Sequence, residues 1–231
     1  MLKLIKFFIG ILLIPTALFL LYDFSGIFIK LISNFSLTLF FLIGASIYLL
    51  LHFFVYNFSG PYVLAHEMSH AICAWLCGYK VTAMKVKEGS GYTKISGSNF
   101  FVFLAPYIVP LFPIIFVLIY LITSVFYKPI TQYRNIFLFI VGFFMAHHLT
   151  HPYLSLTETE QSDIGGAGGH IFSFPLIILI NIALLLILIE FLFPNIIEAD
   201  TLIEKLFNQT ITFWKQFFIY IGKLIGWVRQ L

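Results

Sequence analysis

Charged residues are scarce in this sequence. Asp, Glu, Lys and Arg make up 10% of its 231 residues, whereas apolar residues make up 61%. Water-soluble domains are about 25% charged and about 45–50% apolar, so a soluble fold containing 29 Phe residues would have too little polar surface. The composition therefore excludes an ordinary water-soluble domain and indicates a protein that is solvated by lipid.

Several long segments lack Asp, Glu, Lys, Arg and His altogether. None occurs between Lys6 and Asp23, between Lys30 and His52, or from Ile95 to Tyr127. About 20 apolar residues in a helix cross the hydrocarbon core of a bilayer, and a helix satisfies its own backbone hydrogen bonds, as lipid requires. We therefore expect an all-α integral membrane protein with about five or six transmembrane helices in the lipid bilayer.

The sequence also contains few cysteines and has a small net charge. Cys73 and Cys77 are the two cysteines, which are too few for a disulfide framework and do not form a CxxC motif. The net charge is +3, and the Lys and Arg residues occur in short connections and near the chain ends, as cations that flank membrane spans do. We therefore predict no nucleic-acid partner.

The apolar segments predict the order of the spans. The run Phe7–Tyr22 lacks a clear A-x-A cleavage site, so we interpret it as an uncleaved span rather than a signal peptide. A connection from Asp23 to Asn34 is expected to follow it. The clearest expected spans are residues 4–22, 35–56, 133–150 and 171–193.

The middle of the chain predicts three further elements. A helix is expected over 61–78, because Pro61 suits a first helical position and Gly78 suits a helix end. Residues 79–99 alternate like strands on both sides of Glu88-Gly89-Ser90-Gly91, which predicts a small β-hairpin. The apolar segment 100–127 contains prolines that should kink or break it, at positions Pro106, Pro110 and Pro113.

The helix expected over 61–78 carries an H-E-x-x-H motif, His66-Glu67-Met68-Ser69-His70. Positions i and i+4 share one helix face, so His66 and His70 can bind one metal ion. Glu67 lies about 100° around the helix, where it can reach a water held by the ion rather than the ion itself. Zinc lowers the pKa of such a water to about 7 and polarises a carbonyl. The motif therefore predicts a zinc hydrolase with Glu67 as the catalytic base.

Composition is a poor explanation of this motif. With seven His and seven Glu in the chain, about 0.006 matches are expected by chance. An ionisable group such as Glu67 within an apolar helix is expensive, and it indicates function by default.

A catalytic zinc ion takes three protein ligands and leaves one position open. Asp163 is favoured as the third ligand, because it follows the polar turn TETEQSD and precedes a glycine-rich entry to a span. Glu158 and Glu160 are alternatives. So is a histidine cluster at the end of the preceding span, formed by His147, His148 and His151. Cys73 lies one turn from His70, but it is better explained as a small buried residue.

The segment AHEMSHAICAWLCGYKVTAMKV, followed by GSGYT, resembles the M50 (site-2 protease) metallopeptidases, and more narrowly their short M50B-like bacterial branch. The resemblance covers about residues 60–97 and extends loosely to APYIVP and QSDIGG. In that family two motif histidines and a distant aspartate hold zinc, and the motif glutamate is the base. The resemblance implies that His66, His70 and Asp163 bind Zn²⁺ and that Glu67 is catalytic. The family aspartate usually stands in N-P-D-G or L-D-G, whereas this sequence has Gln161-Ser162-Asp163-Ile164-Gly165.

The resemblance also implies the organisation and the partner. Residues 1–195 would form a multi-pass membrane metallopeptidase domain. Independently of the resemblance, residues 196–231 mix Lys and Arg with Phe, Ile and Trp, which predicts one or two amphipathic helices in the membrane interface. The substrate would be a transmembrane protein, cut within or near the bilayer. The location would be the cell membrane, in bacteria the cytoplasmic membrane.

Two other functions are compatible with the residues. One is a membrane zinc protease of another class, which would use Glu158 or Glu160 as its third ligand. The other is a zinc-binding membrane scaffold or regulator without protease activity. Ionisable residues concentrate in one helix and one loop, which argues against a transporter. We also expect an edge of the hairpin to hold an extended substrate by β-augmentation.

Overall fold

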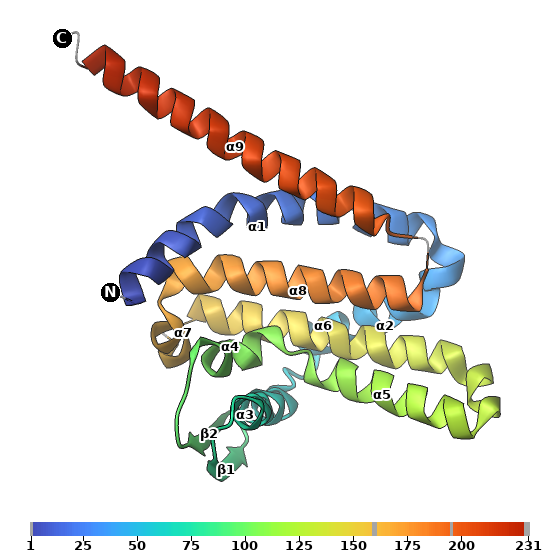
Figure 1. The fold of residues 1–231 in the computed structure, drawn as a ribbon. Helices are drawn as coiled ribbons and strands as arrows, with labels where there is room; N and C mark the ends of the chain where they lie inside the picture. The colour runs from blue at the N-terminus through green and yellow to red at the C-terminus, as the bar shows by residue number, and fades with distance from the viewer. Residues whose placement is uncertain (1, 159–160, 195, 229–231) are drawn as a thin grey trace. The chain divides into compact units, whose positions relative to one another are not determined.

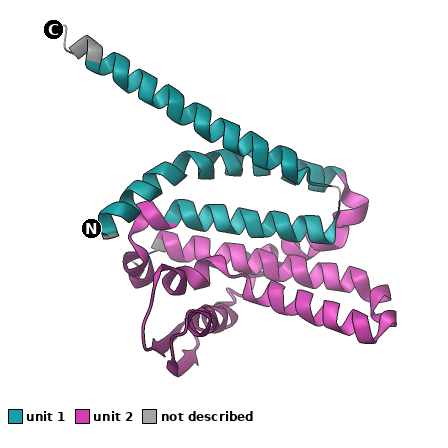
Figure 2. Cartoon of the chain, in the orientation of Figure 1, with its two compact units in different colours: residues 1–33, 174–231 teal, residues 34–173 magenta. Residues whose placement is uncertain are grey.

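The computed structural model describes residues 2–158, 161–194 and 196–228. The chain divides into two compact units, residues 1–33 with 174–231, and residues 34–173 (Figure 2). All the residues that the sequence assigns to zinc binding and catalysis lie in the second unit. The predicted boundary at residue 195 separates a peptidase domain from a tail, which is a division by function. The two packed units do not test it, and it stays a prediction.

The unit of residues 34–173 is mainly helical and contains one hairpin (Figure 1). Its elements are α2 (Phe35–Phe54), α3 (Ser59–Leu76), β1 (Val81–Lys87), β2 (Ser90–Ile95), α4 (Phe100–Ile108), α5 (Leu111–Phe126), the 3₁₀ helix η1 (Lys128–Tyr133), α6 (Arg134–Glu158) and α7 (Ser162–Ala167).

Helices α2 and α6 pack against each other through glycines. A Cβ atom added to Gly44 would overlap the backbone carbonyl of Phe139, and one added to Gly142 would overlap that of Phe41. Such close backbone approach through small residues is typical of helices that associate in lipid. The backbones of α2 and α6 therefore lie in direct contact at Gly44 and Gly142.

The apolar segment after the hairpin is broken, as its prolines predict. Helix α4 ends at Ile108, α5 begins at Leu111, and the two axes differ by 73°. Pro110 is the N-cap of α5 and cannot donate a backbone hydrogen bond. The break therefore falls where the sequence removes a helical hydrogen bond.

The predicted hairpin is confirmed. Strand β1 pairs antiparallel with β2, from Lys87 opposite Ser90 to Val81 opposite Ile95. Gly89 in the turn has φ +75°, a conformation that L side chains rarely adopt. The hairpin contacts α3, and α3 runs across α5 and α6 rather than along them (Figure 1).

The other unit contains α1 (Leu2–Ser33), most of α8 (His170–Leu192) and α9 (Ala199–Val228). The predicted connection from Asp23 to Asn34 is wrong, because α1 continues as helix through Ser33. Asp23 lies inside this helix. Its side chain is buried, and its Oδ1 accepts a 2.6 Å hydrogen bond from Lys205 Nζ on α9. The tail forms one amphipathic helix, and its place in the membrane interface stays a prediction.

The expected loop after residue 150 is largely helical. Helix α6 continues to Glu158 although it contains Pro152, and α7 forms from residue 162. His151 and Pro152 are both buried in this extension. Tertiary packing of a buried face therefore outweighs the polar composition that suggested a loop.

The predicted all-α membrane fold with a small hairpin is confirmed. Among the described residues four helices are long and apolar enough to cross a bilayer, or five if the bent α4–α5 pair is one span. The four segments are Lys3–Ser33, Phe35–Phe54, Lys128–Thr157 and His170–Leu192. Helix α3, which carries the H-E-x-x-H motif, is not one of them.

We predict that Gly44→Ala destabilises the protein, because the added methyl group must push α2 away from α6. Overpacking of this kind costs about 1–3 kcal/mol. The measurement is the thermal unfolding midpoint in detergent. Gly26→Ala is the matched control, because Gly26 is also helical and a Cβ there meets no atom within 4 Å. A Gly44→Ala midpoint equal to that of the control would contradict this packing.

Candidate metal centre

Helix α3 presents the motif histidines on one face. The helix begins after Phe58, which has φ 52°, and Pro61 lies in its first turn, where a missing N–H costs nothing. The rings of His66 and His70 are 4.9 Å apart. Glu67 is on a different part of the helix surface and is 7% exposed. The spacing of the motif therefore produces the arrangement that it predicts.

Asp163 completes a cluster with the two histidines. Its Oδ2 atom is 3.4 Å from His66 Nε2 and 3.4 Å from His70 Nε2. All three candidate ligand atoms lie within 4.8 Å of one another. Ligand atoms about 2.1 Å from a tetrahedral zinc ion are about 3.4 Å apart. The side chains are only 12–18% exposed. The three residues therefore fit a zinc ion in both spacing and donor type.

The orientation of His70 supports a cation at this point. His70 Nδ1 is 2.8 Å from the backbone carbonyl of Val102, which can only accept a hydrogen bond, so Nδ1 carries the proton. In the neutral ring Nε2 is then a lone pair facing the Asp163 carboxylate, which also offers lone pairs. Two acceptors at 3.4 Å need a cation or a proton between them.

His66 has its own outer partner. The Tyr62 hydroxyl lies 3.3 Å from His66 Nδ1 and 2.8 Å from Ser155 Oγ. The Tyr62 ring stacks on His151, with centroids 4.5 Å apart and planes 7° apart. Partners of this kind fix the ring orientation of a metal-binding histidine. Tyr62 therefore connects the candidate ligand on α3 to two residues of α6.

Helix α7 carries Asp163 into the cluster. Ile164 and Ala167 are fully buried and anchor the short helix. A Cβ at Gly166 would lie 2.6 Å from the ring of Phe103, so glycine lets α7 pack against this ring of α4 without displacing it. Burial raises the pKa of the Asp163 carboxyl, but when His66 and His70 are protonated at Nε2 their hydrogen bonds and charge outweigh burial and hold that pKa well below its usual range. Asp163 is therefore ionised, which is the form that binds a cation.

The alternative third ligands lie elsewhere or are not described. Glu160 and the side chain of Glu158 are outside the described residues. The clustered histidines of α6 are buried but do not belong to the three-residue group; His151 instead packs against His52, with ring centroids 4.9 Å apart. Cys73 is half-buried and also outside the group. In the part of the chain that the structure describes, Asp163 is thus the residue that joins His66 and His70.

Sequence reasoning missed three polar neighbours of the site. Tyr62 contacts His66, Tyr107 donates a 3.4 Å hydrogen bond to Asp163 Oδ2, and Thr93 donates to the Glu67 carboxylate. Tyr107 and Thr93 belong to a broken helix and a strand, so no motif spacing marks them. Only the position of Tyr62, four residues before His66 on the same helix face, offered a signal.

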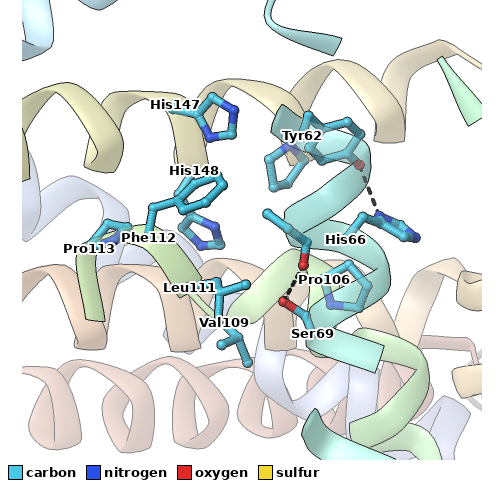
Figure 3. A pocket seen from close by; sticks show the side chains of 12 residues that line it. Tyr62, His66, Ser69, Pro106, Val109, Leu111, Phe112, Pro113, His147 and His148 are labelled. Carbon is cyan, nitrogen blue, oxygen red and sulfur yellow. Dashed lines mark hydrogen bonds between the residues drawn. The ribbon is translucent and has the colours of Figure 1, made fainter. Parts of the chain in front are cut away.

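A narrow pocket opens beside His66, between α3, the α4–α5 break and α6 (Figure 3). Irregular backbone at membrane depth is tolerated where it lines a cavity, and the break at Pro110 does so. Its lining residues are Tyr62, Ala65, His66, Ser69, Pro106, Val109, Leu111, Phe112, Pro113, His147, His148 and Pro152.

We predict that Tyr62→Phe weakens metal binding about 10-fold, the low end of the effect of losing an outer-shell partner. The substitution keeps the ring that stacks on His151 and removes only the hydroxyl next to His66. The measurement is zinc affinity by competition with a chelator. Tyr153→Phe is the control, because Tyr153 is 68% exposed. Equal zinc affinities for the two variants would show that the Tyr62 hydroxyl does not support metal binding by His66.

Comparison with known proteins identifies the family. The model of the Peptidase M50B-like family matches residues 39–157, a little over half of the chain. The match includes His66, Glu67 and His70 and ends before Asp163. No curated protein and no solved structure gave a significant match. The H-E-x-x-H motif on α3 therefore lies within the matched residues of a multi-pass membrane protein, and Asp163 lies six residues beyond them. This chain belongs to the M50B-like family of membrane metallopeptidases.

Proposed function

We propose that this protein is a zinc-dependent intramembrane endopeptidase that hydrolyses peptide bonds of transmembrane proteins in the cell membrane. The observation that carries the proposal is the approach of Asp163 Oδ2 to within 3.4 Å of both His66 Nε2 and His70 Nε2. The family supports a peptidase, and the donor set of two imidazoles and one carboxylate supports zinc.

Each residue of the site has a distinct part in the proposed reaction. A zinc ion held by His66, His70 and Asp163 supplies Lewis acidity and lowers the pKa of water. Glu67 takes one proton from the attacking water as the water oxygen bonds to the substrate carbonyl carbon. When the C–N bond breaks, Glu67 delivers that proton to the leaving amine. The buried Tyr107 hydroxyl donates to Asp163 Oδ2 and so helps to hold that carboxylate in place.

A transmembrane substrate has to unwind before its peptide bonds can react. The hairpin supports this step, because a two-stranded sheet leaves an edge on each strand and the sheet contacts α3. An extended substrate segment can add to such an edge through backbone hydrogen bonds. The pocket at the α4–α5 break lies next to His66, and its volume of about 10 Å³ is enough for one water molecule. Bound to such an edge, the substrate would lie across the face of α3 that carries the metal site.

We predict that wild-type protein binds about one zinc per chain and cleaves a model transmembrane substrate. Glu67→Gln should keep zinc but lose about 10²–10⁴-fold in cleavage rate, because only the proton acceptor is removed. Asp163→Ala should lose zinc affinity, because one ligand is removed. Zinc content and cleavage are measured in parallel.

Glu88→Gln is the matched control, because Glu88 is exposed in the hairpin turn and outside the site. If Asp163→Ala keeps zinc while loss of Glu158 or Glu160 releases it, the protein uses the glutamate ligand of another zinc protease class. Zinc binding without any cleavage would favour the scaffold or regulator. Absence of zinc from metal-replete wild type would refute the proposal.

A further inference from the structure

Strand β2 touches the Glu67 side chain directly. Thr93 Oγ1 donates a 2.7 Å hydrogen bond to Glu67 Oε2, and it also lies 3.1 Å from the backbone carbonyl oxygen of Glu67. Thr93 and Glu67 are 26 residues apart. The contact therefore depends on the packing of the hairpin on α3 and not on local helix geometry.

A second residue of β2 faces the same carboxylate. Residues two apart on a strand lie on one face, so Gly91 accompanies Thr93. A Cβ at Gly91 would lie 2.6 Å from Glu67 Cγ and 2.9 Å from Glu67 Oε1. Tyr92, between them, is 46% exposed and belongs to the opposite face. The inner face of β2 thus fits around the Glu67 side chain and leaves no room for a larger residue at position 91.

This arrangement matches what a base at this position needs. Glu67 is 7% exposed, and a buried carboxylate is costly without a hydrogen-bond donor. Thr93 donates to Oε2 and so fixes the rotation of the carboxylate, which keeps further lone pairs that can accept a proton. A free glutamate side chain has several rotamers, and small errors in the placement of a catalytic group can cost about 10²-fold in rate.

We propose that Thr93 is a positioning residue that holds the Glu67 carboxylate in its reactive orientation, with Gly91 leaving the space this orientation requires. The inference rests on the proposed peptidase function and extends it, since it makes the hairpin part of the catalytic apparatus as well as a surface for substrate.

The hairpin has separate contacts that maintain its own fold. Thr82 Oγ1 donates to the Lys94 carbonyl, and the Lys80 backbone N–H donates to Ser96 Oγ. Both contacts join the two strands, whereas the Thr93 hydroxyl reaches across to α3. Thr82→Val therefore removes the same group as Thr93→Val from the same hairpin without touching Glu67, which makes it a matched control.

We predict that Thr93→Val lowers kcat about 10- to 100-fold, with KM within about twofold of wild type and zinc content unchanged. Valine keeps the shape and β-branching of threonine and removes only the donor. Thr93→Ser should restore kcat to within a few fold of wild type, and Thr82→Val should match wild type. A general loosening of the hairpin would instead change Thr93→Val and Thr82→Val alike.

A readout without catalysis comes from the metal-free protein. Labelling of Glu67 by a water-soluble carbodiimide, followed by mass spectrometry, should be slow in wild type and Thr82→Val and several-fold faster in Thr93→Val. If Thr93→Val does not fold, Gly91→Ala decides, because the added methyl group would lie 2.6 Å from Glu67 Cγ and 2.8 Å from Val63 Cγ1 and must displace these side chains. It should lower kcat and keep zinc.

The outcomes separate the two proposals. Wild-type cleavage that disappears in Glu67→Gln supports the proposed function, and failure there refutes it whatever the hairpin variants do. With that cleavage established, wild-type kcat and wild-type labelling in Thr93→Val overturn the positioning role alone. Wild-type kcat in Gly91→Ala does the same where Thr93→Val cannot be made.

Discussion

The candidate site depends on one contact, in which the Asp163 carboxylate lies beside the imidazoles of His66 and His70 inside a mostly apolar protein. His66 and His70 come together through helix periodicity, but Asp163 reaches them only because α7 packs closely on α4. Three groups with lone pairs, largely out of water, repel one another unless a cation lies between them. The rest of the 34–173 unit holds these three side chains together, and strand β2 holds the Glu67 side chain through Thr93.

The lipid environment limits which forces can hold the helices of this unit together. Without a hydrophobic driving force between helices, α2 and α6 associate by backbone approach at Gly44 and Gly142. The same need for close approach explains Gly166, which lets α7 reach Phe103 and so delivers Asp163. These glycines therefore set how closely the helices approach one another, and Gly166 in this way sets the position of Asp163.

Features that depend on neighbouring residues could be predicted from the sequence. Features that depend on contacts between residues far apart in the chain could not. The H-E-x-x-H spacing, the hairpin and the proline break are short-range patterns, and the structure contains all three elements. The end of α1 was mispredicted because Lys205, far along the chain, pairs with Asp23. Asp163 could be ranked above Glu158 only by its context, since the order of residues does not fix which carboxylate a folded loop turns inward. Tyr107 and Thr93 have no signature in the sequence, because both act through contacts with residues far along the chain.

The most direct test of the account is X-ray absorption spectroscopy at the zinc edge of the purified, zinc-loaded protein. The account predicts nitrogen and oxygen ligands alone at about 2.0–2.1 Å, with scattering from two imidazole rings. The fit should change when Asp163 is replaced by alanine. A sulfur ligand at about 2.3 Å would bring Cys73 into the site. That result, or a spectrum that Asp163→Ala leaves unaltered, would contradict the ligand set of His66, His70 and Asp163.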